Sequence, residues 1–321
     1  MTRPRGLRGK ALAGIALGGL VLVGALTLGR MTAMAAPARW GAHGHRIATR
    51  AALRTLPAGV PAFFRSAQEQ LEYLAPEPDR WYSQDLREMD GAWRYDHFID
   101  LENVPPSALG QPDRFSFLES LVASEVESPH QTVGFLPFRV VELYQRLVSG
   151  FARWRLTPDG SDRQWIQARI LNDAGILGHY VVDAAQPHHT TIHYNGWAEG
   201  APNPEGFTTD REFHARFESQ FVSANIRQGD LDDRMADAPR RLNQVSSAVW
   251  EFIEASNGQV RPLYRLEKTH GFDPEGPAPP ETREFVLQRL TEGAEMLRAL
   301  WWAAWRESDD LARRERGRRV P

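Results

Sequence analysis

The chain has no cysteine among its 321 residues. Zinc sites built on thiolate and catalysis by a cysteine nucleophile are therefore excluded, so any metal site must use imidazole and carboxylate groups. No disulfide can stabilise the fold, which leaves a packed core or bound metal to do so. With 42% hydrophobic and 25% charged residues, a chain of this length can bury a sizeable core.

The chain also lacks an excess of positive charge. It has 38 basic and 41 acidic residues, and five of the basic ones precede Ala38, so the remainder carries a formal charge of −8. A protein that holds nucleic acid only by electrostatic attraction to phosphates is expected to be basic. Any phosphate chemistry here must take its positive charge from something other than lysine and arginine.

Charge is absent altogether from residues 11–29, which follow a basic stretch and precede small-residue runs at 33–38. This layout predicts a secretory signal peptide over residues 1–38. The run also reaches the roughly 18 residues of a membrane span, so an uncleaved N-terminal anchor that associates with the membrane is the alternative. In both cases we expect the rest of the chain to be exported: secreted, periplasmic or held outside the membrane.

Strand signals are nearly absent from the remaining sequence. Helical periodicity between proline- and glycine-rich loops predicts helices over residues 45–56, 61–71, 137–155, 162–185, 210–225, 240–255 and 281–310. In 162–185 apolar residues recur at helical spacing, with Asp162 at the expected N-cap, which indicates a central buried helix. We therefore predict an all-α fold, with one multi-helix domain over residues 39–310 and a basic C-terminal tail over residues 311–321, frayed at residues 313–319.

Seven of the ten histidines fall in four short segments that contain or neighbour a carboxylate or a tryptophan. His179 and Asp183, and later His214 and Glu218, are four residues apart, which places each pair on one helix face. A lone pair of this kind is more often a surface hydrogen bond. The 162–185 helix is otherwise apolar, however, so burying its pair without a metal or partner would cost several kcal/mol. Two such pairs on successive helices indicate a metal site in a helical bundle.

Two upstream segments supply further candidate ligands, one from Trp40 to His45 and one containing Asp79 and His97. His97 is equally consistent with an ordinary core histidine, and Asp79 with a helix N-cap. Imidazole and carboxylate without thiolate favour zinc, with manganese, iron and nickel as alternatives. A histidine-rich helical bundle can also bind metal or haem without catalysis, as an exported carrier or structural protein.

The order of these motifs resembles the zinc-dependent phospholipase C and single-strand-specific nuclease (nuclease P-one type) superfamily. The motifs are Trp40-Gly41-x-x-Gly44-His45, Pro78-Asp79, His97-Phe98-Ile99-Asp100, His179-x-x-x-Asp183-x-x-Gln186-Pro187-x-His189 and His214-x-x-x-Glu218. The Gln186-Pro187 pair is the most distinctive of them. The resemblance implies an all-α phosphoester hydrolase domain with up to three zinc ions at the bottom of a cleft.

By position, the resemblance implies the following ligand sets: Asp79, His97, His179 and Asp183 for a first zinc ion, His189, His214 and Glu218 for a second, and Trp40, His45 and Asp183 for a third. Asp79 would also be the catalytic residue that orients or deprotonates the attacking water. His43 and His188 are candidates for places beside the ligands or in the cleft. In the family the tryptophan is the mature N-terminus and binds through its amine, whereas Arg39 precedes Trp40 here, so removal of Arg39 is needed to restore that ligand.

Three divalent ions held by three carboxylates leave a local charge of about +3, which supplies the positive charge for a phosphate. We expect a metal-activated water to cleave phosphodiester bonds of phospholipid or single-stranded nucleic acid. Trp81, Trp93 and Trp197 lie near ligand segments and are candidates for stacking a nucleobase, although a place in the packed core or at its rim is the more common use for any one tryptophan. An N-terminal anchor would favour a phospholipase. The sequence indicates no protein partner.

Overall fold

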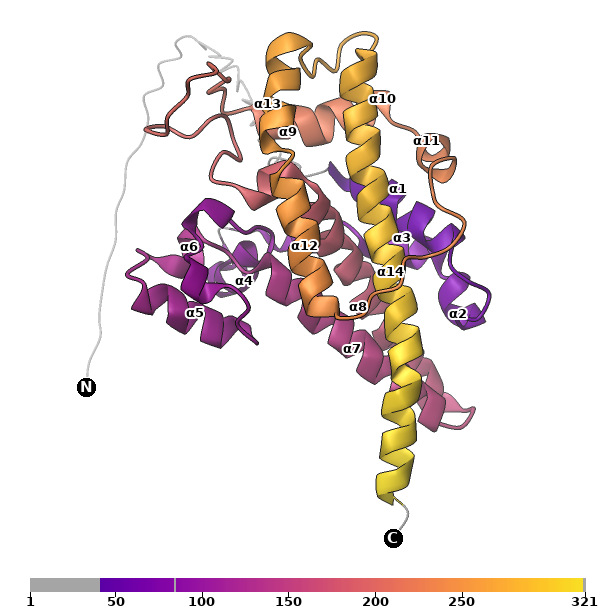
Figure 1. Cartoon of the computed structure of the whole chain (residues 1–321). Helices are drawn as coiled ribbons and strands as arrows, with labels where there is room; N and C mark the ends of the chain where they lie inside the picture. The colour runs from indigo at the N-terminus through magenta and orange to yellow at the C-terminus, as the bar shows by residue number, and fades with distance from the viewer. Residues whose placement is uncertain (1–40, 84, 320–321) are drawn as a thin grey trace, which may run out of the picture. The chain divides into compact units, whose positions relative to one another are not determined.

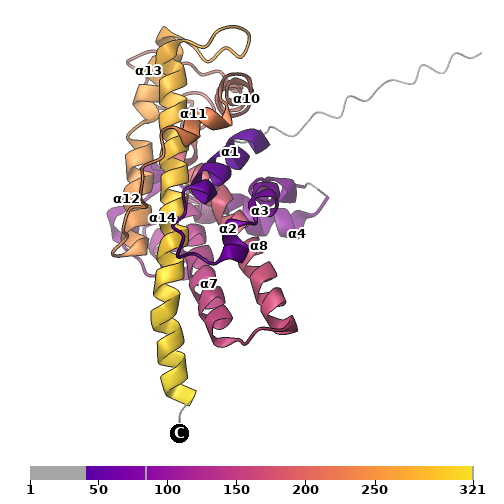
Figure 2. The same ribbon diagram turned by 90° about the vertical axis from the view of Figure 1, so that its right-hand side faces the viewer.

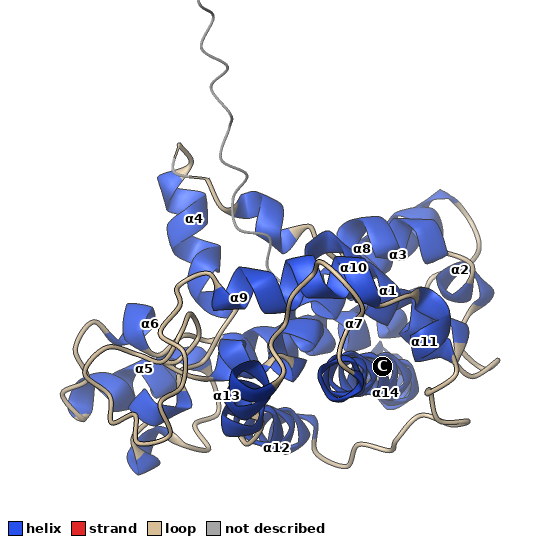
Figure 3. Cartoon of the chain, turned by 90° about the horizontal axis from the view of Figure 1, so that it is seen from above, coloured by secondary structure: helices blue, strands red, loops and turns tan. Residues whose placement is uncertain are grey.

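The computed structural model describes residues 41–83 and 85–319. Within these ranges every regular element is helical, and the one strand-like pairing is a single antiparallel bridge between Ile99 and Gly134 (Figure 3). The predicted all-α class is therefore confirmed. The predicted signal peptide or anchor, Arg39 and Trp40 lie outside the described residues, as do the last two residues of the predicted tail. No helix in the described part of the chain combines the length and the apolar character that crossing a bilayer requires.

The longer helices are α1 (Gly41–Arg54), α5 (Arg114–Ala123), α7 (Leu136–Leu156), α8 (Ser161–Ala185), α12 (Val245–Asn257), α13 (Val260–Thr269) and α14 (Pro280–Arg319). The shorter ones are α2 (Ala62–Arg65), α3 (Gln68–Leu74), α4 (Arg87–Trp93), α6 (Pro129–Thr132), α9 (Phe213–Ala215), α10 (Val222–Asn225) and α11 (Gln228–Asp232). One-turn 3-10 helices are η1 (Pro78–Trp81), η2 (Arg94–Asp96), η3 (Leu101–Asn103), η4 (Pro106–Ala108) and η5 (Pro187–Thr190). A π-helical turn, η6 (Arg216–Phe221), joins α9 to α10.

The helix α8 lies at the centre of the fold. It forms a hairpin with α7, and α14 runs along both of them, while α1 and α3 also contact α8 (Figures 1 and 2). The 40 residues of α14 correspond to about 60 Å of helix. Because α8 has neighbours on several sides, all residues from 173 to 185 are buried. Polar side chains in that stretch need partners inside the protein.

A glycine in α8 allows α3 to approach it closely. A Cβ atom on Gly175 would lie 2.4 Å from the Cβ of Leu74, so a larger residue does not fit there. The close approach brings the carbonyl of Ala75, directly after α3, to 2.8 Å from Nδ1 of His179. The packing of two helices thus positions one of the candidate ligands.

Several helix boundaries differ from those predicted. The predicted helix 61–71 is two helices, α2 and α3, and the hydroxyl of Ser66 between them donates to the carbonyl of Ala62 at 2.8 Å, which is a local alternative to continued helix. The predicted N-cap, Asp162, instead lies in the first turn of α8, which begins at Ser161. The helices α5 and α13 were not predicted.

The prediction that residues 313–319 are frayed is wrong. They continue α14 as regular helix. Ala312 is fully buried, and Arg313 pairs with Asp309 one turn earlier at 2.9 Å, so the extension has both an apolar contact and a supporting ion pair.

Candidate metal centre

One carboxylate in α8 faces four imidazoles. Oδ2 of Asp183 lies 3.1 Å from Nδ1 of His97 and 3.2 Å from Nε2 of His179. Its Oδ1 lies 3.5 Å from Nε2 of His45 and 3.9 Å from Nε2 of His189. All five side chains are at most 3% exposed. The helix α1, the segment after η2, α8 itself and η5 therefore meet at one buried carboxylate.

Backbone carbonyls orient two of these rings. His179 donates through Nδ1 to the carbonyl of Ala75 at 2.8 Å, and His189 donates through Nδ1 to the carbonyl of His97 at 2.6 Å. Donation from Nδ1 leaves Nε2 as the unprotonated nitrogen of a neutral ring. In both residues that nitrogen faces the carboxylates, which is the orientation a metal ligand needs.

A second group forms around Glu218 in the π-helical turn. Oε2 of Glu218 lies 2.9 Å from Nε2 of His214 and 3.5 Å from Nε2 of His189. Gln186 donates through Nε2 to the same oxygen at 3.1 Å, and its Oε1 accepts from the backbone N–H of His188. Single π-helical turns are frequent at functional sites. Gln186 thus orients Glu218 while shaping the turn that carries His189.

Asp79, in η1, completes the set. Its Oδ1 lies 3.6 Å from Nε2 of His179 and 3.9 Å from Nδ1 of His97, and its side chain is 22% exposed. The ligand atoms form three groups, each within 4.8 Å: His45, Asp79 and His179; His97, His179 and Asp183; His189, His214 and Glu218. The structure thus gathers every predicted ligand except Trp40, which is outside the described residues. The grouping differs from the predicted sets in placing Asp79 with His45.

The donors in these groups fit divalent cations. His45 is fully buried, and neither of its ring nitrogens has a hydrogen-bond partner among the described residues. Oδ1 of Asp183 is buried without a hydrogen bond from the described chain as well. Each such atom costs about 1–3 kcal/mol if nothing binds it. Nitrogen and carboxylate donors without thiolate match the coordination preferences of several divalent metals.

The protonation states of Asp183, Glu218 and His45 are those that metal binding requires. Burial opposes ionisation of Asp183, but His179 and His189 hold its pKa well below the usual value. Burial likewise opposes ionisation of Glu218, but His214 and His189 lower its pKa. Burial lowers the pKa of His45 well below that of a free imidazole. The carboxylates of Asp183 and Glu218 are therefore charged and the His45 ring is neutral. All three groups can bind a cation in these states.

An ion-pair network that the sequence analysis missed fixes the segment carrying His97. Asp96 is 1% exposed and accepts from Nη1 of Arg114 at 2.9 Å and from Nε of Arg139 at 2.6 Å. Farther along the segment, the N–H of Ile99 donates to the carbonyl of His189 at 2.8 Å. These contacts anchor the residues on both sides of His97 to α5, α7 and η5.

A cavity of about 210 Å³ adjoins the group around Glu218. Its lining consists of Arg94, Tyr95, Phe98, Asp100, Gln131, His188, His189, Tyr194 and His214. Asp100 is 7% exposed, and burial together with the nearby Glu102 raises its pKa to about 8. At neutral pH its carboxyl group is therefore mostly protonated and can both donate and accept a hydrogen bond. The sequence motif contained Phe98 and Asp100 but gave neither a role.

The other candidates have different surroundings. His188 is fully buried, lines the cavity and lies among the rings of Phe213, His214 and Phe217, and burial lowers its pKa well below the usual value. Nε2 of His43 instead lies 3.0 Å from the carbonyl of Ile226, where it connects α1 to the residue after α10.

None of the three candidate tryptophans lines the cavity. The rings of Trp81 and Trp93 contact each other at 5.3 Å, and Trp197 is buried and stacks on His193 at 3.7 Å. The aromatic residues of the cavity are Tyr95, Phe98 and Tyr194.

A scan against models of protein families finds no match to this chain, and a search of curated proteins finds none either.

Proposed function

We propose that the protein is a zinc-dependent phosphodiester hydrolase of the phospholipase C and single-strand-specific nuclease (nuclease P-one) type. The observation that carries the proposal is the meeting of eight predicted ligands, drawn from residues 45 to 218, in three adjoining groups. Five imidazoles and three carboxylates without thiolate suit zinc. The basic and apolar pattern of residues 1–38 supports export of the protein, by a cleaved signal or with a retained anchor.

Bound zinc ions supply positive charge for phosphate oxygens and lower the pKa of water. The chain contributes the rest. Asp79 has the most exposed carboxylate of the three groups, so it is the one placed to orient an incoming water and accept its proton. Asp183 and Glu218 are buried and ionised, and they keep the ligand groups in place.

The cavity beside His189 and His214 favours single-stranded nucleic acid as the substrate. The rings of Phe98 and Tyr95 line the cavity, and stacking of a base on an aromatic ring contributes roughly 1–3 kcal/mol per base. The carboxyl group of Asp100 lines the same cavity and is a candidate for hydrogen bonds to a base edge. A phospholipid headgroup is the alternative occupant. The presence of a cavity next to the ligands favours an enzyme over a carrier whose metal is enclosed by protein.

The test is an assay of zinc-loaded protein on three substrates: a dinucleotide, a single-stranded oligonucleotide and phosphatidylcholine vesicles. We expect cleavage of the first two. Asp79→Asn should lower kcat by about 100-fold or more, the range for loss of a general base. Asp85→Asn, a change of the same kind at an exposed position six residues away, should have no effect. Absence of cleavage of all three esters by metal-loaded protein, or full activity of Asp79→Asn, would contradict the proposal.

A further inference from the structure

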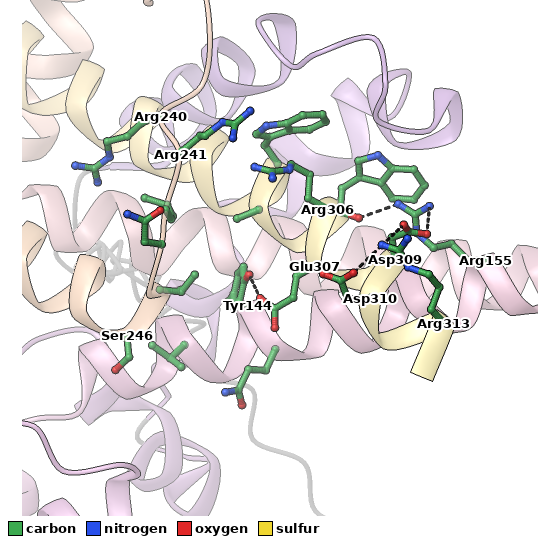
Figure 4. Close-up of a pocket in the computed structure, with 18 residues that line it drawn as sticks. Tyr144, Arg155, Arg240, Arg241, Ser246, Arg306, Glu307, Asp309, Asp310 and Arg313 are labelled. Atoms are coloured by element: carbon green, nitrogen blue, oxygen red, sulfur yellow. Dashed lines mark hydrogen bonds and ion pairs between the residues drawn. The ribbon is translucent and has the colours of Figure 1, made fainter. Parts of the chain in front are cut away.

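A second concave surface lies between α7, α14 and the loop 233–244. This groove has a volume of about 720 Å³ and shares no residue with the lining of the cavity beside the metal groups. Its walls include five arginines and two tryptophans (Figure 4). Such a concentration of positive charge is unexpected in a chain with a formal charge of −3.

Three of the five arginines have no acidic partner. Arg155 lies 3.7 Å from Asp309, and Arg313 lies 2.6 Å from Asp310, so two of the three acids in the lining are already neutralised. The third, Glu307, accepts a hydrogen bond from Tyr144. Within the described chain, no carboxylate pairs with any of the remaining arginines, which are Arg240, Arg241 and Arg306.

The wall that carries two of these arginines is held in place by a buried one. Arg298 is fully buried and donates to the carbonyls of Ala236 and Ala238 at 2.7 and 3.1 Å. The N–H of Ala236 donates in turn to Glu295 at 2.7 Å. Two residues of α14 and two of the loop are thus connected by hydrogen bonds, at positions that precede Arg240 and Arg241 in the chain. These hydrogen bonds hold the loop against α14.

Two of the three unpaired guanidinium groups extend toward one another across the groove (Figure 4). Figure 4 shows Arg241, from the loop, and Arg306, from α14, extending toward the same part of the groove, whereas Arg240 points away from them. Trp302 lines the same groove and is partly exposed. Unpaired guanidinium groups and a partly exposed indole in one groove are a combination that can bind a single strand, because guanidinium groups contact phosphates and an indole stacks on a base.

We propose that this groove binds single-stranded nucleic acid at a site separate from the metal centre, with Arg241 and Arg306 on phosphates and Trp302 on a base. The choice of nucleic acid rests on the proposed function. A concave groove admits a flexible strand but not the flat surface of a bilayer, so a strand is favoured over an anionic membrane. The groove increases the affinity for strands long enough to reach it and leaves the cleavage of a dinucleotide unchanged.

The experiment measures binding of a fluorescent phosphorothioate oligothymidylate, which keeps the backbone charge and resists hydrolysis, to the zinc-loaded protein at several salt concentrations. Each phosphate contact contributes about 0.7 to the slope of log K against log salt for a single strand. The double variant Arg241→Ala/Arg306→Ala should therefore flatten the slope by about 1.4 and weaken binding about 25-fold at 0.1 M salt. Arg241→Lys/Arg306→Lys should retain most of the slope.

Arg314→Ala/Arg316→Ala is the matched control, because it removes an equal charge of two from α14 outside the groove. It should leave binding unchanged, and the Arg241→Ala/Arg306→Ala variant should cleave a dinucleotide at the wild-type rate. Equal oligothymidylate binding by wild type and the Arg241→Ala/Arg306→Ala variant overturns the inference, as does arginine-dependent binding to anionic vesicles but not to the oligonucleotide. If the protein cleaves no ester and yet binds the strand through these arginines, the proposed function fails and the groove assignment stands.

Discussion

Removing bound metal from the purified protein should lower its melting temperature. An ion that binds only the folded chain stabilises it by about 2.7 kcal/mol when free metal is at 100 times Kd. For a domain of this size, 1 kcal/mol moves Tm by roughly 2 °C, so each ion contributes about 5 °C. Because two of the three ligand groups share His179, their contributions will be less than additive.

Two aspartates of α8 provide a matched pair of variants for this prediction. Asp183 faces histidines, whereas Asp173, ten residues earlier and equally buried, pairs with Arg146 at 2.7 Å. We expect Asp183→Asn to lose most of the difference in Tm between zinc-loaded and chelator-treated protein, measured by differential scanning calorimetry. Asp173→Asn should lower both values of Tm and retain their difference. If the wild type melts at one temperature with and without chelator, the assignment of these residues as metal ligands is refuted.

Two further predictions concern acid stability and backbone geometry. The pKa of Glu218 is lowered in the folded state, so the stability it contributes is present above the unfolded value of about 4.3 and is lost as pH falls toward the folded value. When the free energy of unfolding is measured with urea between pH 3 and 6, it should fall less steeply toward acid pH for Glu218→Gln than for wild type. Equal declines in the two proteins would contradict the lowered pKa of Glu218. Gly134→Ala should lower the free energy of unfolding by more than the roughly 1–3 kcal/mol of backbone strain, because φ is +84° and a Cβ would lie 2.2 Å from the carbonyl oxygen of Phe98. Gly110 has φ +77° and no neighbour within 4 Å of an added Cβ, so Gly110→Ala should lose free energy of unfolding through backbone strain alone. If urea unfolding gives equal losses for the two variants, the steric argument is contradicted.

The candidate ligands were identifiable from the sequence because their signals are local. His179 with Asp183 and His214 with Glu218 are spaced for one helix face, and the structure places each pair within 3.2 Å. The contacts that hold the site together have no such signal. Asp96 pairs with arginines 18 and 43 residues away, and no periodic pattern connects those positions. Which ligands meet in one group likewise depends on tertiary packing.

Helix type was more predictable than helix extent. The missed helix α13 contains Pro262, which argues against helix in a sequence pattern. In the structure this proline lies in the first turn, where backbone N–H groups have no partner within the helix, so it removes no hydrogen bond. The π-helical turn that carries Glu218 also lacks a sequence signal, because it depends on one extra residue within an otherwise regular helix.

The carboxylate of Asp183 has a consequence for the order of folding and metal uptake. Its four imidazole neighbours come from separate stretches of chain, the first in α1 and the last in η5. An unfolded chain offers no comparable constellation, so tight metal capture must come after long-range assembly of the bundle. Substitution with a coloured cation such as cobalt would then give an optical signal that reports the last stage of folding rather than the formation of individual helices.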